Sequence, residues 1–212
     1  MRIMPSRNVI KQYVAHSYYH IYNRGVAKHP IFIDEQDKNY FLKIIERHLD
    51  PNNTAMKADG LTYRKFDKDL TLLCYCLMGN HFHMLCYVYE DARALSLFMQ
   101  SLLTAYTMYF NKRYKRVGTL FQGVYKASLI CEESYLLHIS RYIHLNPRRY
   151  KTYRHSSLAF YTGTPPPVWI NPQQILDLDD FTAKGYLEFL EDYEDHKLML
   201  DEIKNEMAAY DY

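Results

Sequence analysis

Two histidines one position apart, His81 and His83, are the side chains in this sequence best suited to chemistry. They lie in an apolar run, 72–88, that is interrupted by Gly79 and Asn80. Because side chains alternate faces along a strand, a strand here places both imidazoles on one face, about 7 Å apart at the backbone. Two such rings can converge on one metal ion, although neutral imidazoles also pack as ordinary half-buried side chains. The pair therefore predicts a metal site only if other groups accompany it.

Three further side chains share one row of a helix that the sequence predicts over 134–146, where Pro147 ends it. His138, Tyr142 and Asn146 fall at positions i, i+4 and i+8, beside the apolar stripe that would face the core. An imidazole, a phenol and an amide in one row could form a reactive surface. Any solvated helix face also carries three polar residues, so this row alone is weak support for a site.

Charge is distributed unevenly along the chain, although the net charge is only +2. Between 101 and 155, ten Lys or Arg are opposed by two Glu, whereas 172–212 contain twelve Asp or Glu and three Lys. A basic segment of this kind predicts a polyanion-binding surface, or simply a solvated basic helix face. Several of the 22 tyrosines lie among the basic residues, which suits single-stranded nucleic acid because bases stack on aromatic rings.

Composition and spacing exclude several other classes of protein. No apolar run is long enough to span a bilayer, and the N-terminus lacks the apolar core of a signal peptide. The four cysteines show no CxxC spacing and are interpreted as small core residues in a reducing cytoplasm. Glycines 118 and 123 have the spacing of a phosphate loop, but Val124 and Tyr125 stand where Lys and Ser or Thr are required. We therefore expect a cytoplasmic protein with no nucleoside triphosphate site and no membrane partner.

The pattern of elements predicts an α+β fold with one antiparallel sheet. Strands are expected over 13–24, at two places within 70–89, and over 126–131, and helices over 34–49, 92–114 and 134–146. This order fits a ferredoxin-like sandwich with its helices on one face of the sheet. A Pro-rich segment after Thr164 predicts a boundary between a domain, 1–163, and an acidic helical extension, 164–212, with helices beginning near Asn171 and over 181–207.

Five blocks of sequence, in this order, resemble the single-tyrosine HUH transposases, and among them the REP-associated tyrosine transposases. They are residues 19–25 (YHIYNRG), 77–83 (LMGNHFH), 109–114 (YFNKRY), 118–123 (GTLFQG) and 142–147 (YIHLNP). The resemblance implies a metal-dependent endonuclease and strand transferase that acts on single-stranded or hairpin DNA through a 5′-phosphotyrosine intermediate.

By the same resemblance, Tyr142 is the nucleophile, His81 and His83 hold a divalent metal, and Asn146 supplies a third ligand. In related insertion-sequence transposases that ligand is a Gln one turn after the tyrosine, so Asn146 is a shorter substitute. Mg²⁺ prefers oxygen ligands and imidazole suits Mn²⁺, so activity is expected with either ion. Val124 departs from the pattern, because an Arg is expected after Gly123.

The basic residues are expected to hold the DNA backbone, and the metal, His138 or Arg141 could help Tyr142 to lose its proton. The DNA-binding set comprises Lys112, Arg113, Lys115, Arg116, Lys126, Arg141, Arg148 and Arg149. Two other hypotheses are a non-catalytic, domesticated single-stranded nucleic-acid-binding protein and a small metal-dependent hydrolase unrelated to DNA. Neither the choice between monomer and homodimer nor the cognate DNA follows from the sequence.

Overall fold

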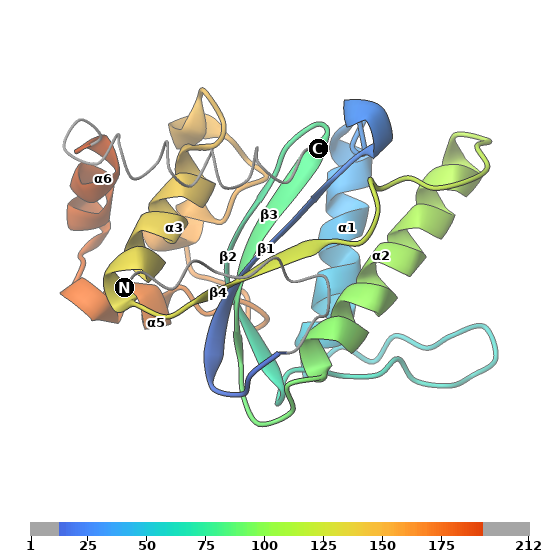
Figure 1. The fold of residues 1–212 in the computed structure, drawn as a ribbon, viewed down its shortest axis with the longest axis horizontal. Coiled ribbons are helices and arrows are strands. Elements are labelled where there is room, and N and C mark those ends of the chain that lie inside the picture. Colours follow the sequence, from blue (N-terminus) through green and yellow to red (C-terminus); the bar gives the residue numbers. More distant parts are fainter. Residues whose placement is uncertain (1–12, 193–212) are drawn as a thin grey trace, which may run out of the picture.

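A computed structural model describes residues 13–192 (Figure 1). Within that range four strands form one antiparallel sheet in the order β2-β3-β1-β4. The strands are β1 (Ser17–Arg24), β2 (Leu70–Leu77), β3 (His81–Val88) and β4 (Lys126–Ile130). With a helix between β1 and β2 and another between β3 and β4, this order is that of a ferredoxin-like sandwich. The predicted α+β fold is confirmed.

Six α-helices surround the sheet in the described part of the chain. They are α1 (Glu35–Leu49), α2 (Ala94–Arg113), α3 (Glu133–Leu145), α4 (Leu158–Tyr161), α5 (Gln173–Leu176) and α6 (Ala183–Glu191). Single 3-10 turns cover Val26–Lys28, Tyr150–Thr152 and Asp177–Asp179. None of the helices in residues 13–192 combines the length and the apolar character needed to cross a bilayer.

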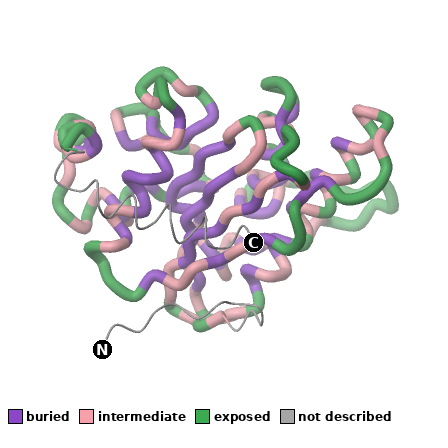
Figure 2. The backbone as a smooth tube through the Cα atoms, turned by 45° about the horizontal axis from the view of Figure 1, so that its top comes forward, coloured by how far each residue is buried: buried purple, intermediate pink, exposed green. Residues whose placement is uncertain are grey.

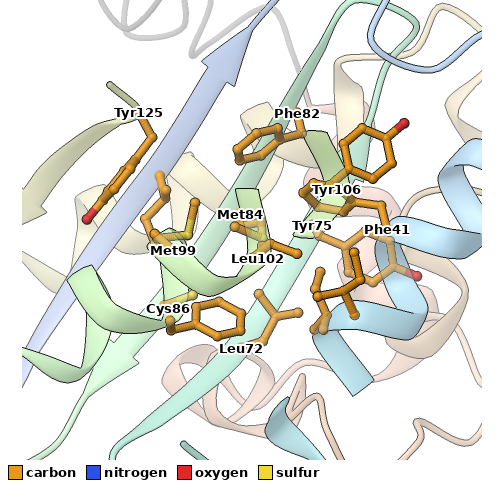
Figure 3. Packing of buried hydrophobic residues seen from close by; sticks show 14 of the residues in the cluster. Phe41, Leu72, Tyr75, Phe82, Met84, Cys86, Met99, Leu102, Tyr106 and Tyr125 are labelled. Atoms are coloured by element: carbon orange, nitrogen blue, oxygen red, sulfur yellow. The ribbon is translucent and has the colours of Figure 1, made fainter. Parts of the chain in front are cut away.

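The first face of the sheet is covered by α1 and α2, as the sequence predicted (Figure 1). Side chains at alternate positions of β3, from Phe82 to Val88, pack there with Phe41 of α1 and Leu102 of α2 (Figure 3). These residues are buried, and burying a side chain of this size stabilises the fold by roughly 2 kcal/mol. The apolar face predicted for β3 is therefore the core face, and the histidines lie on the other one.

The second face is covered as well, which corrects the expectation of helices on one face only. The stripe Leu136, Ile139 and Ile143 of α3 packs on the side of the sheet that carries Leu85. Ile175 of α5 joins the same cluster, as do buried residues of α4 and α6. The buried strands thus lie between two layers of helices (Figure 2). The division into a domain, 1–163, and an extension, 164–212, stays a prediction.

Local sequence signals account for most of the element boundaries. The Asp34 carboxylate accepts from the backbone N–H of Asp37 and caps α1, and Gly79 and Asn80 separate β2 from β3. The helix expected from Asn171 is only the short α5, and the helix expected over 181–207 is described as α6, with the rest lying outside the described residues. Cys74, Cys76 and Cys86 are buried core residues as predicted, whereas Cys131 is exposed just after β4.

A buried carboxylate joins α1 to the C-terminal end of α2. Asp37 is fully buried and accepts from the Arg113 guanidinium, from the Tyr109 and Tyr114 hydroxyls and from the backbone N–H of Ile33. Arg113 also pairs with Asp34, which holds the pKa of that carboxyl below its usual range. Since Arg113 is engaged in this cluster, its position in the fold is explained without DNA.

Replacing Asp37 by Ala should lower the free energy of unfolding by about 3 kcal/mol, because the half-buried Arg113 guanidinium, two hydroxyls and the backbone N–H of Ile33 lose an acceptor. Urea denaturation followed by circular dichroism measures the loss. Glu35→Ala is a matched control, since this carboxylate is exposed in the first turn of the same helix. Equal stability of the two variants would contradict the role assigned to Asp37.

Candidate active site

The two histidines lie at the start of β3, where the β2–β3 hairpin meets the C-terminal end of α3 (Figure 1). His81 Nε2 is 3.0 Å from Asn146 Oδ1, although 65 residues separate them in the sequence. The His83 ring lies edge-on to the Tyr142 ring, with centroids 5.3 Å apart. The four side chains that the sequence predicted to act together are therefore brought together by the fold.

Asn80 determines which nitrogen of His81 carries a proton. Its Nδ2 donates to the carbonyl of Lys28, so its Oδ1 faces His81 Nδ1 at 2.7 Å and accepts from it. A neutral His81 then has a lone pair on Nε2, and this lone pair faces the oxygen of Asn146. Double protonation would satisfy both oxygens, but burial lowers the pKa of His81 by more than the hydrogen bond to Asn146 raises it, and the charge of Arg24 lowers it further. A bound cation would remove the repulsion between the lone pairs of His81 Nε2 and Asn146 Oδ1.

His83 is arranged similarly by a third imidazole, that of His20 on β1. His20 Nε2 and His83 Nδ1 are 3.1 Å apart, and both rings are buried. Burial lowers the pKa of His20 to about 3 and the pKa of His83 well below its usual range, so both rings are neutral near pH 7. His83 Nε2 is buried and has no hydrogen-bond partner within residues 13–192. If His83 Nδ1 donates to His20, then His83 Nε2 has a lone pair that faces the site.

Asn146 directly follows the last residue of α3, one turn after Tyr142, so their side chains meet. Burial raises the pKa of Tyr142 to about 12, and a hydrogen bond from the Asn146 amide opposes that rise. Asn146 thus directs its nitrogen to the phenol and its oxygen to His81. The phenol also lies edge-on to His20, with ring centroids 6.0 Å apart.

A buried polar network holds α3 against the rest of the protein. His144 Nδ1 is 2.8 Å from the Tyr186 hydroxyl of α6, and His144 Nε2 is 2.8 Å from Ser157 Oγ. The Tyr186 hydroxyl donates to Ser140 Oγ of α3, and Ser157 Oγ accepts from the backbone N–H of Tyr75 in β2. Because the network is fully buried, any rotation of α3 would leave polar atoms unsatisfied.

The donor set fits a divalent cation that takes mixed ligands. His81 Nε2, His83 Nε2 and Asn146 Oδ1 would hold it, two as neutral imidazoles and one as an amide oxygen. Within residues 13–192, no three side chains of His, Cys, Asp or Glu are grouped so that they could hold a metal by themselves. The set therefore depends on Asn146, which makes this residue the most informative of the three ligands.

The predicted DNA-binding residues differ in how far they are exposed. Lys112, Lys115, Arg148 and Arg149 are exposed, Arg116 is half-buried over the Phe110 ring, and Arg113 is held in the Asp37 cluster. Lys126 is half-buried on β4, where it pairs in register with Tyr22.

Arg141 is the one predicted DNA-binding residue that the structure places in the interior. It is 1% exposed, and its guanidinium lies 3.7 Å from the centre of the Phe189 ring of α6. His138, the other predicted helper of Tyr142, also makes a ring contact with Phe189, with centroids 6.2 Å apart. Both side chains are therefore directed toward α6, and their predicted help to Tyr142 gains no support from a contact with the phenol.

Three residues near the centre were missed by sequence reasoning: His20, Asn80 and Arg24. A usable signal existed for His20, since a strand over 13–24 puts it on one face with Tyr22 and Arg24. Periodicity did not set the register between this strand and the strand that carries His83, so the contact with His83 was not foreseen.

Replacing His83 by Ala should abolish tight Mn²⁺ binding, because it removes the unpartnered nitrogen. Replacing His20 by Phe should weaken binding by about 10- to 100-fold, the usual effect of losing the partner that orients a ligand. The free-ion signal in electron paramagnetic resonance titrations measures both changes. His29→Ala is the control, because His29 is exposed near the same end of the sheet. Binding by His83→Ala as tight as that of the unaltered protein would contradict the site.

Comparison with known proteins identifies the family of the chain. The family model described as "Transposase IS200 like" matches residues 13–146. The chain is similar to the structure of a REP-associated tyrosine transposase bound to a REP hairpin, with 12% identity, a TM-score of 0.53, and coverage of 82% of this chain and 93% of that chain. A tRNA(His) guanylyltransferase from Saccharomyces cerevisiae, with 9% identity, 88% and 81% coverage and a TM-score of 0.37, is too distant to bear on fold or function.

No curated protein matches the chain. The family match nevertheless covers more than half of the sequence and includes both the histidine pair and Tyr142. The chain therefore belongs to the IS200-like transposase family, whose members are DNA-cleaving enzymes.

Proposed function

We propose that this transposase cleaves single-stranded DNA with Tyr142 as the nucleophile and rejoins the cleaved end to another strand. The observation that carries the proposal is the convergence of Tyr142 and Asn146 of α3 on His81 and His83 of β3. A phenol, two neutral imidazoles and an amide oxygen at one place supply a nucleophile together with ligands for a divalent metal, Mg²⁺ or Mn²⁺.

The proposed step exchanges one phosphodiester for another. Tyr142 Oη loses its proton and attacks the scissile phosphorus, so that the bond from phosphorus to the 3′ oxygen breaks as the bond to Oη forms. The products are a 5′-phosphotyrosine and a free 3′-hydroxyl, which takes up a proton. Attack by another 3′-hydroxyl on the phosphotyrosine reverses the exchange, so strand transfer requires no nucleoside triphosphate.

Each residue of the centre has a distinct task in this step. The hydrogen bond from the Asn146 amide favours the phenolate of Tyr142, whose pKa burial raises to about 12. When bound, the metal supplies Lewis-acid stabilisation of the charge that develops on the phosphate. His20 and Asn80 hold the two ligating imidazoles in the tautomers that leave a lone pair toward the site.

The exposed basic residues support a DNA substrate. Lys112, Lys115, Arg148 and Arg149 are exposed, and only Pro147 separates Arg148 and Arg149 from Asn146 in the chain. Contacts from such residues to the phosphate backbone would make binding fall steeply with salt. The structural similarity to a transposase bound to a REP hairpin supports hairpin DNA as one substrate to test.

Replacing Tyr142 by Phe should abolish covalent attachment to an end-labelled oligonucleotide while leaving DNA binding unchanged within about twofold, because only the nucleophilic oxygen is lost. Denaturing gels measure attachment, and fluorescence anisotropy measures binding. The screen should include single-stranded and hairpin oligonucleotides with Mg²⁺ or Mn²⁺.

Tyr135→Phe is the control, since it removes a hydroxyl from the same helix. A Tyr142→Phe variant that attaches DNA like the unaltered protein would contradict the assignment of the nucleophile. Tight DNA binding by the unaltered protein without metal-dependent cleavage of any oligonucleotide would instead indicate a non-catalytic binding protein.

A further inference from the structure

Arg24 occupies the last position of β1, directly opposite His81. The two residues are partners in the antiparallel register of β1 and β3, so their side chains leave the same face of the sheet with Cβ atoms about 5 Å apart. The positive charge of Arg24 reaches the His81 ring, where it adds to the effect of burial on the pKa of that histidine. The Arg24 side chain therefore begins beside that of His81, one of the candidate metal ligands.

Gln122 contacts Arg24 through both its side chain and its backbone. Arg24 Nε donates to Gln122 Oε1 over 2.7 Å, and the backbone N–H of Gln122 donates to the carbonyl of Arg24 over 2.8 Å. The same strand-like pairing continues through an isolated bridge between Gly25 and Phe121. A hydrogen bond at Nε restricts the orientation of the planar guanidinium group.

The segment that carries Gln122 is 118–123, which has the glycine spacing of a phosphate loop but no lysine. Gly118 and Gly123 have φ values of 90° and 67°, a left-handed backbone that favours glycine. Asn111 Nδ2 of α2 donates to the carbonyl of Gly118 over 2.9 Å. The two glycines thus let the backbone bend at both ends of this segment, and the segment brings Gln122 to Arg24.

We infer that Arg24 binds a non-bridging oxygen of the scissile phosphate, and that Gln122 is the positioning residue that orients it. The inference rests on the proposed cleavage by Tyr142, which puts a phosphate beside His81. A planar guanidinium matches phosphate oxygens with two parallel hydrogen bonds, and it stabilises the charge that increases in the transition state. If Arg24 does not bind DNA, its contact with Gln122 serves only to join β1 to the segment 118–123. An experiment can separate these two roles.

The test compares an ordinary oligonucleotide with one whose scissile phosphate, mapped with the unaltered protein, is replaced by a neutral methylphosphonate. Arg24→Ala should slow cleavage of the ordinary oligonucleotide about 100-fold at saturating DNA, the usual cost of losing one such donor. On the methylphosphonate, which lacks the charged oxygen, Arg24→Ala and the unaltered protein should cleave at equal rates. Gln122→Leu should slow the ordinary reaction about tenfold and likewise show no effect on the methylphosphonate.

Arg93→Ala is the control for loss of a positive charge, because Arg93 is exposed and pairs with Asp91 before α2. Thermal melting confirms that each variant is folded, and Arg24→Lys replaces Arg24→Ala if the latter is not. Unchanged cleavage by the Arg24 variant, or the same loss on both oligonucleotides, would overturn the inference while the role of Tyr142 stands. Failure of the unaltered protein to cleave any oligonucleotide would remove the proposed function, and this inference with it.

Discussion

The contact between α3 and the histidine-bearing face of the sheet is the feature on which the whole centre depends. It sets the phenol of Tyr142 edge-on to the imidazoles of His83 and His20, with ring centroids 5.3 and 6.0 Å apart. The apolar stripe of α3 makes this contact favourable, and the buried hydrogen bonds of His144 allow only one orientation of the helix. The phenol of Tyr142 and the candidate metal ligands His81 and His83, which belong to different elements, are thereby held in one arrangement.

Burial then determines the chemistry of the imidazoles. Charged imidazolium is costly away from water, so burial lowers the pKa values of His20, His81 and His83. A neutral ring has one donor nitrogen and one acceptor nitrogen. The neighbouring hydrogen-bond partner determines which nitrogen carries the proton. Asn80 and His20 are placed to leave the acceptor of His81 and of His83 toward the site. The same burial that stabilises the fold therefore keeps the two candidate metal ligands neutral.

Sequence patterns predicted the parts of the site that depend on local periodicity. Strand alternation put His81 and His83 on one face, and helical spacing put Tyr142 beside Asn146. Contacts that depend on which elements become neighbours could not be predicted in this way. The approach of His20 to His83, the cover that Phe189 places over Arg141, and the engagement of Arg113 by Asp37 all join residues more than 40 positions apart. The second helical layer was missed for the same reason, since periodicity shows that α3 is amphipathic but not which face of the sheet it covers.

The central claim is that Tyr142 is the residue that becomes joined to DNA, and peptide mapping tests it most directly. Protein trapped on a single-stranded oligonucleotide would be digested with nuclease and protease and analysed by tandem mass spectrometry. We expect a nucleotide joined through its 5′ phosphate to Tyr142. We also expect attachment to be lost when divalent metal is chelated beforehand. A nucleotide found on another tyrosine, such as Tyr22 or Tyr135, would contradict it.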